Sequence, residues 1–160
     1  MLRSIALTLV IALTTPAFVR AADPKNDEAK AIAVKVTTAG ASLFDAKDAA
    51  ALAATFTEEA RLDVTIKDKD AGTYKTETKQ GRTQIEAYYR EVFKSDATYH
   101  AKNTVEYARE IGPNLILFAG TFEPDSQAAD PLKLAFVQVR VKNGEAWRVV
   151  SMQVFVVLDQ

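Results

Sequence analysis

Residues 45–64 read Asp45-Ala-Lys-Asp48-Ala-Ala-Ala-Leu52-Ala-Ala-Thr-Phe56-Thr-Glu-Glu-Ala60-Arg-Leu-Asp-Val64, and this stretch decides the fold. Asp48 can cap a short helix, because its carboxylate can accept a hydrogen bond from a free backbone N–H of the first turn. Leu52 and Phe56 would then lie on one face of that helix. Residues 61–66 follow with the composition of a strand. The stretch therefore predicts a short capped helix that leads directly into a strand.

The segment before this stretch has the pattern of a longer helix over residues 24–46. Asp23 supplies a cap, and Pro24 is tolerated in a first helical turn. The apolar side chains recur at the spacing of one helical face; they are Ala29, Ile32, Ala33, Val36, Ala39, Leu43 and Phe44.

A third helix is predicted near residues 83–93, after a strand over residues 73–78. Thr83 and Glu86 form a capping-box pair. The apolar positions then recur at three and four residues; they are Ile85, Tyr88, Tyr89, Val92 and Phe93.

From residue 97 onward the hydrophobic period is close to two. Strands are predicted near residues 97–110, 114–123, 132–142 and 146–158, with tight turns at 112–114 and 142–144. Helices first and an antiparallel meander afterwards indicate an α+β domain.

Two later segments complete a recognisable pattern with residues 45–64: Gly81-Arg-Thr-Gln-Ile85-Glu-Ala-Tyr88-Tyr89 and Trp147-Arg-Val-Val-Ser-Met152. Together the three resemble the SnoaL-like branch of the nuclear-transport-factor-2-like superfamily. The resemblance implies a cystatin-like cone, in which a curved antiparallel sheet wraps around three helices and encloses a pocket. Members of this superfamily include isomerases, cyclases, dehydratases, binding proteins and assembly domains, so the fold alone does not choose a function.

The resemblance to the ketosteroid isomerases within this superfamily allows a test of that chemistry. Those enzymes use a carboxylate base with a tyrosine and a neutral carboxylic acid as oxyanion hole. The corresponding positions hold Val64, Gly40 and Val137 here. Asp63 is one residue from the base position, and a one-residue step in a strand points the side chain to the opposite face. Steroid-isomerase chemistry is therefore not expected.

The same correspondence predicts an apolar inward face on the strands: Leu62, Val64, Phe118, Gly120, Phe122, Ala135, Val137, Val139, Val150, Met152 and Val154. Tyr88 and Tyr89 would close the pocket and offer hydroxyl groups. The candidate ligand-binding residues are Tyr88, Tyr89, Phe118, Phe122, Val137 and Met152. The alternative is that these side chains simply fill a packed core.

The opposite face of the sheet is predicted to carry Gln138, Arg140, Ser151, Gln153 and Phe155. The resemblance implies that this convex face joins two copies of the chain, and a mixed polar and aromatic face suits an interface. The alternative is an ordinary solvated face with one exposed aromatic ring.

These observations predict a cone that binds a small apolar or amphipathic molecule without a cofactor. One alternative is an enzyme acting on a cyclic carbonyl substrate through His100, Tyr88 or Tyr89, and another is a homodimeric assembly domain. The chain has no cysteine and a single histidine, which excludes thiolate and His-rich metal sites. His100 is itself better explained as an exposed or capped strand residue.

Residues 1–21 have the pattern of an export signal, with Arg3, an apolar run over residues 5–13 and Val19-Arg20-Ala21 as a cleavage site. The alternative is a buried N-terminal helix. Cleavage would leave one domain, residues 22–160, in the periplasm or outside the cell. The net charge of −1 offers no basic surplus for nucleic acid or anionic lipid, so neither nucleic acid nor a membrane is expected as a partner after cleavage.

Overall fold

The computed structural model of the chain describes residues 24–67, 72–95, 101–124 and 133–157. The predicted signal segment, Asp23 and His100 lie outside the described residues. The elements, in chain order, are α1 (Pro24–Asp45), α2 (Ala49–Ala54), β1 (Phe56–Lys67), β2 (Tyr74–Gln80), α3 (Arg82–Val92), β3 (Ala101–Gly112), β4 (Leu115–Pro124), β5 (Lys133–Asn143) and β6 (Ala146–Val157).

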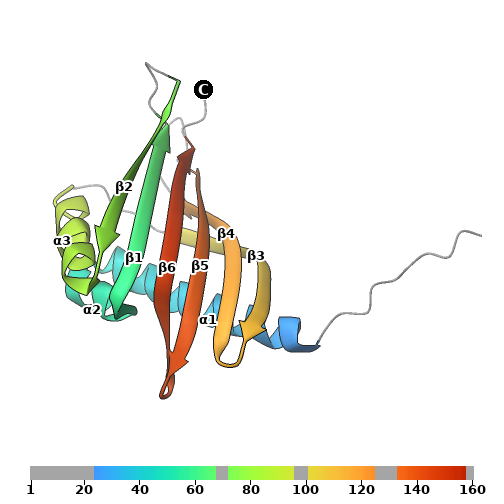
Figure 1. Cartoon of the computed structure of the whole chain (residues 1–160). Helices are drawn as coiled ribbons and strands as arrows, with labels where there is room; N and C mark the ends of the chain where they lie inside the picture. Colours follow the sequence, from blue (N-terminus) through green and yellow to red (C-terminus); the bar gives the residue numbers. More distant parts are fainter. Residues whose placement is uncertain (1–23, 68–71, 96–100, 125–132, 158–160) are drawn as a thin grey trace, which may run out of the picture.

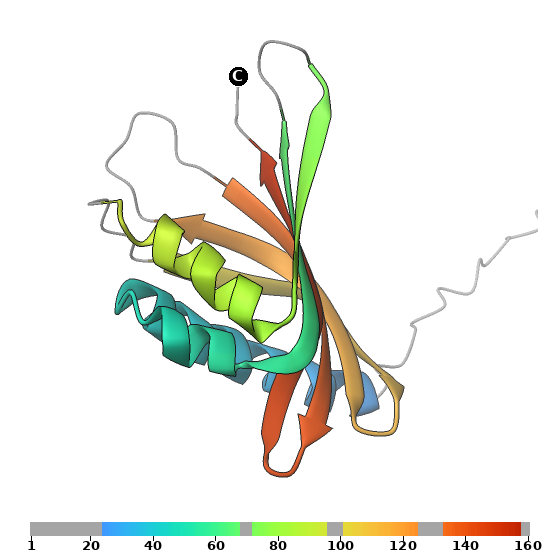
Figure 2. The same ribbon diagram turned by 60° about the vertical axis from the view of Figure 1, so that its left-hand side comes forward.

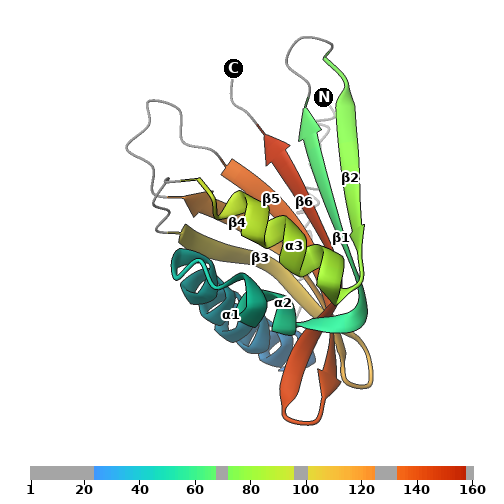
Figure 3. The same cartoon turned by 90° about the vertical axis from the view of Figure 1, so that its left-hand side faces the viewer.

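The six strands form one curved sheet in the order β2-β1-β6-β5-β4-β3 (Figure 1). All three helices lie on the same side of this sheet, its concave side, as Figures 2 and 3 show. Every neighbouring pair of strands is antiparallel except β1 and β6, which run parallel. The predicted α+β cone of a curved sheet around three helices is therefore confirmed, with a mixed rather than a purely antiparallel sheet.

The stretch from α2 into β1 follows the prediction closely. The carboxylate of Asp48 accepts a hydrogen bond from the backbone N–H of Ala51 at 2.9 Å, which caps α2. Phe56 is the first residue of β1 and not part of the helix, so the predicted helical face is shorter than expected. Phe56 and Leu52 are nevertheless both buried in the same hydrophobic cluster.

The start of α3 differs from the predicted capping box. The helix begins after Gly81, whose φ of +82° lies in the region that favours glycine, and no side chain caps it. The Gly81 N–H donates to the carbonyl of Ala60 at 2.7 Å, so β1 fixes where this helix begins. Glu86 pairs with Arg90 one turn later instead of reaching back to the helix start.

Two hydrophobic clusters hold the helices against the sheet. The first joins α2 and α3 to β1 and β6 around Phe56, Leu62 and Ile85. The second joins α1 to β3, β4 and β5 around Ala33 and Phe118. Within the described residues, no helix is long and apolar enough to cross a membrane.

Candidate functional site

The two clusters do not fill the concave side of the sheet completely, and a cavity of about 270 Å³ remains there. Its walls come from all three helices and from every strand except β2. Most of the side chains that line it are apolar. They are Val36, Ala41, Phe44, Leu52, Phe56, Leu62, Val64, Val92, Phe122, Leu134, Phe136, Val149, Met152, Val154 and Val156, together with Gly40, Thr37, Thr55, Tyr88, Tyr89, Asn103, Gln138 and Arg140.

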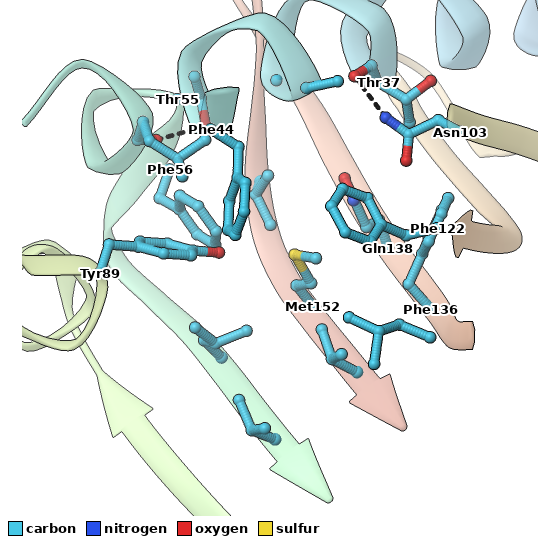
Figure 4. A pocket seen from close by; sticks show the side chains of 18 of the residues that line it. Thr37, Phe44, Thr55, Phe56, Tyr89, Asn103, Phe122, Phe136, Gln138 and Met152 are labelled. Atoms are coloured by element: carbon cyan, nitrogen blue, oxygen red, sulfur yellow. Dashed lines mark hydrogen bonds between the residues drawn. The ribbon is translucent and has the colours of Figure 1, made fainter. Parts of the chain in front are cut away.

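Aromatic rings make up one wall of the cavity. Phe44 at the end of α1 packs edge-on against Phe122 and Phe93, with ring centroids 5.5 and 5.0 Å apart. Tyr89 of α3 lies 6.4 Å from the rings of both Phe44 and Phe56. Figure 4 shows Phe44, Phe56 and Tyr89 converging from the helices and β1 toward the strands on the opposite side. Edge-to-face packing of this kind gives the wall a defined shape.

The two tyrosines bring hydroxyl groups to this apolar wall. Burial raises the pKa of Tyr89, and the neighbouring Tyr88 raises it further. Burial also raises the pKa of Tyr88, with a smaller contribution from the negative charge of Glu77. Both phenols therefore stay protonated at neutral pH and can donate a hydrogen bond. Among the described residues the Tyr89 hydroxyl has no hydrogen-bond partner, and in Figure 4 it points into the cavity.

The strand β5 faces the cavity with the opposite set of residues from the one predicted. Leu134, Phe136, Gln138 and Arg140 point inward. The predicted inward orientation was wrong for Val137, Ala135 and Val139. The predicted outward orientation was therefore also wrong for Gln138 and Arg140. Both faces of β5 carry apolar side chains, so alternation alone does not fix which face is buried.

A bulge opposite the end of β5 shifts β6 by one residue. Val139 pairs with Ser151, whereas Arg140 pairs with Val149, so Val150 is left over. Val149 and Met152 both face the cavity as a result, whereas Val150 is 39% exposed. The predicted inward position of Val150 is corrected to Val149.

Of the predicted ligand-binding residues, Tyr88, Tyr89, Phe122 and Met152 line the cavity. Phe118 does not line it. This residue is completely buried in the cluster under α1, where its ring packs edge-on against Phe136. The structure thus brings four of the six residues together, and places Phe118 behind them and Val137 on the outer face of the sheet.

Sequence reasoning missed Gln138 and Arg140, which carry the strongest polar groups of the cavity. Arg140 is only 5% exposed. Its Nε donates to Oε1 of Gln138 at 3.0 Å, and its Nη1 donates to the carbonyl of Trp147 at 3.0 Å. The signal that could have found them is the position of Phe136, because the largest apolar side chain of β5 shares its face with both residues.

Arg140 keeps its charge in this surrounding. Burial lowers the pKa of Arg140 to about 10, and the nearby Tyr89 opposes the shift, so the guanidinium is protonated at neutral pH. Its carbon Cζ lies 5.9 Å from the ring centre of Phe118. A cation–π contact contributes about 0.5–2 kcal/mol, whereas burying an ion costs several kcal/mol. Among the described residues, no carboxylate forms an ion pair with this guanidinium.

Asp63 lies on the other side of the sheet, as the alternation of the strand predicts. Its carboxylate accepts hydrogen bonds from Arg61 at 2.8 Å and from the Thr78 hydroxyl at 2.6 Å. The hydrogen bond from Arg61, and then that from Thr78, lower the pKa of Asp63 and outweigh its burial, which raises it. Asp63 is therefore part of a polar network on the outer face and does not reach the cavity.

The described residues contain no group of three or more histidine, cysteine or acidic side chains that could hold a metal ion.

Asn103 of β3 donates a hydrogen bond to the Thr37 carbonyl of α1 at 3.0 Å and connects these two elements at the cavity wall (Figure 4).

No family model and no curated protein sequence matches the chain. Several solved structures of other proteins are similar to it. A domain of unknown function with a cystatin-like fold from Nostoc punctiforme is similar with a TM-score of 0.63 and 15% identity, over 82% of this chain and 79% of that one. A nuclear-transport-factor-2-like protein of unknown function from Shewanella oneidensis has a TM-score of 0.61 and 12% identity, over 79% and 98% of the two chains.

A ketosteroid isomerase-like protein from Erwinia carotovora is also similar, with a TM-score of 0.61 and 12% identity, over 86% of this chain and 99% of that one. At these identities the likeness concerns the backbone and carries no activity with it. The chain has the fold of the nuclear-transport-factor-2-like superfamily.

Proposed function

We propose that this protein binds a small apolar or amphipathic molecule in the cavity of the cone. The observation that carries the proposal is the cavity itself, which keeps about 270 Å³ open between one aromatic wall and aliphatic side chains. Ligand sites in proteins are mostly apolar concavities with a few placed polar groups, and this one is near the lower end of their usual size of about 300–1,000 Å³. A small ligand is therefore favoured.

Binding is favoured over catalysis by the composition of the walls. General acid–base chemistry needs a group that exchanges protons near neutral pH. Among the described residues that line the cavity there is no carboxylate and no histidine, and the pKa values of Tyr88 and Tyr89 are raised further from neutrality. A tyrosine in this place can orient a ligand by donating a hydrogen bond.

The test is to fill the cavity without disturbing the fold. Gly40 of α1 lines the cavity, and a Cβ atom added there would meet no atom within 4 Å. Gly40→Leu should therefore place its side chain in the cavity. The matched control is Ala39→Leu, which places the same leucine side chain at the neighbouring exposed position of α1.

The probe is the neutral dye N-phenyl-1-naphthylamine, whose fluorescence rises in apolar surroundings. We expect the parent protein and Ala39→Leu to bind the dye with the same affinity, and Gly40→Leu to lose at least about tenfold in affinity, the fold-change of 1.4 kcal/mol. Equal binding by all three proteins would place the dye outside the cavity and would overturn the proposal.

We also propose that the outer face of the sheet joins two copies of the chain. The cross-strand register places Leu117, Val139 and Ser151 in one row and Ala119, Val137 and Gln153 in the next. Antiparallel sheets that face water usually present polar side chains there. Here β4 and β5 present apolar ones, with polar residues at the sides, and this is the composition of an interface.

A further inference from the structure

Arg140 is a buried cation without a carboxylate beside it. A guanidinium has five N–H donors. Two of the five have acceptors, the side chain of Gln138 and the carbonyl of Trp147, which leaves three without an acceptor among the described residues. The side chain is 5% exposed, so bulk water has little access to these donors.

Further donors of the cavity lack acceptors as well. Arginine has no acceptor atom, so the Gln138 amide must present its oxygen to Arg140, and its NH₂ group is directed elsewhere. This NH₂ group and the Tyr89 hydroxyl have no acceptor among the described residues. Arg140 is also the one charged side chain among the described residues that line the cavity. The potential inside is therefore positive, and the polar groups are arranged to donate.

The polar groups occupy one end of an otherwise apolar strand face. Leu134, Phe136, Gln138 and Arg140 follow one another along β5 on the cavity side. Leu134 and Arg140 are six residues apart, which is about 20 Å along a strand. A ligand lying along β5 would thus meet apolar side chains over much of its length and the donors at one end, beside Met152 of β6.

We propose that the ligand is a small apolar monocarboxylate, whose carboxylate pairs with Arg140 and Gln138 and whose hydrocarbon part lies along Phe136 and Leu134. This inference rests on the proposed binding function and specifies its ligand class. One guanidinium balances one negative charge, which favours a monoanion over a phosphate. The two oxygens of a carboxylate also match the fork of a guanidinium.

The experiment compares octanoate with 1-octanol, which have the same chain length and differ in the charged head. Calorimetric titration of the full chain at pH 7 should show that octanoate binds about tenfold more tightly than octanol, or better. Arg140→Met keeps the length of the side chain and removes the charge. It should weaken octanoate binding by about the same factor and leave octanol binding unchanged.

Arg90→Met is the matched control, because Arg90 is exposed on α3 and does not line the cavity. It should preserve the preference for octanoate. The comparison of the two ligands on the parent protein needs no variant, so it decides the question even if Arg140→Met does not fold.

Three outcomes would count against the inference in different ways. Equal affinity of the parent protein for octanoate and octanol would overturn the monocarboxylate proposal and leave the binding function standing. Equal weakening of both ligands by Arg140→Met would show that Arg140 only maintains the shape of the cavity. Binding of neither ligand would contradict the proposed function together with the inference.

Discussion

Tyr89 holds its hydroxyl group in the wall of the cavity without a described partner, although the side chain is only 7% exposed. A buried hydroxyl that lacks a hydrogen bond costs about 1–3 kcal/mol. We expect Tyr89→Phe to leave the melting temperature unchanged or to raise it. Octanoate affinity should fall by about 1 kcal/mol, the contribution of one hydrogen bond. Calorimetry and thermal denaturation of the same samples test both; a lower melting temperature with unchanged affinity would show a structural partner instead.

Asp63 gives a prediction that depends on pH. The pKa of Asp63 in the folded protein lies below its ordinary value, because its carboxylate accepts hydrogen bonds from Arg61 and Thr78. The ionised carboxylate therefore stabilises the fold above this value, and the contribution is lost as the pH falls through the folded pKa. Asp63→Asn should lower the free energy of unfolding at pH 7 by on the order of 1 kcal/mol or less, since Arg61 is half exposed.

The difference between Asp63→Asn and the parent should shrink as the pH falls through the folded pKa of Asp63, because both side chains are neutral below it. Urea denaturation at several pH values measures it, and ligand affinity should not change. A stability difference that persists undiminished at the lowest pH would mean that shape, not charge, matters at this position.

Asp63 and Val137 show how far single positions could be predicted. Asp63 was placed correctly, because its apolar neighbours Leu62 and Val64 both face the core and alternation turns Asp63 to the opposite face of β1. Val137 was placed wrongly by the correspondence with the ketosteroid isomerases. The sequence pattern did not correct this, because β5 alternates Val and Ala with Leu, Phe, Gln and Arg and so carries apolar side chains on both faces. Arg140 was missed, because a charged residue on a strand normally faces water and only the face that it shares with Phe136 indicated otherwise.

The helices and strands were predicted better than their ends. The Asp48 cap depends on local chemistry and was found, whereas α3 starts where Gly81 hydrogen-bonds to Ala60, and this contact belongs to the assembled sheet. The bulge at Val150 was likewise missed, because it arises from the pairing of β5 with β6. Local signals predict elements, but their boundaries depend on tertiary contacts.

Replacing glycine by alanine should change the free energy of unfolding in opposite directions at Gly120 and Gly40. A Cβ at Gly120 of β4 would lie 1.9 Å from the backbone oxygen of Thr104, so Gly120→Ala must force β3 and β4 apart. We expect a loss of about 3 kcal/mol of unfolding free energy. Gly40→Ala meets open space in the helix α1 and should gain about 1 kcal/mol. Denaturant unfolding of both variants tests this, and equal effects would contradict the packing at Gly120.

Phe56 links α2 and α3 to the sheet from the start of β1. It is 2% exposed and packs beside Tyr89. Phe56→Ala should reduce the unfolding free energy by about 3 kcal/mol or more. An unchanged denaturation midpoint would show that this cluster does not carry the stability of the fold. Exposed Phe155, also on a strand, offers the control, since Phe155→Ala should cost the monomer far less.

The shape of the cone followed from three short motifs and their order, because they mark core positions that fix how helices meet the sheet. Whether the cone is open could not follow from them. The cavity exists because the side chains from eight elements leave a space between them. That space depends on how the side chains pack in three dimensions, and the sequence pattern does not specify it. The sequence therefore predicted the fold, whereas the polar residues at one end of the cavity were not predicted.

The two faces of the sheet together predict the oligomeric state. The cavity occupies the concave side, so the apolar outer face around Val137 and Val139 is left for a partner, and a second copy can meet it across a two-fold axis. Gln138 and Arg140, expected on this face, belong to the cavity instead. Light scattering at micromolar concentration should therefore find a dimer of the parent protein.

Val137→Asp together with Val139→Asp should convert that dimer to a folded monomer, because four like charges would be buried around the axis. The matched control is Val34→Asp, which introduces the same charge at a valine of α1 that is 47% exposed on the helical side of the molecule. That variant should stay dimeric. Since the cavity lies on the opposite side of the sheet, the monomer should also keep the parent's affinity for octanoate, measured by the same calorimetric titration. A monomeric parent, or a dimer that survives both aspartates, would show that this face is simply an apolar surface in contact with water.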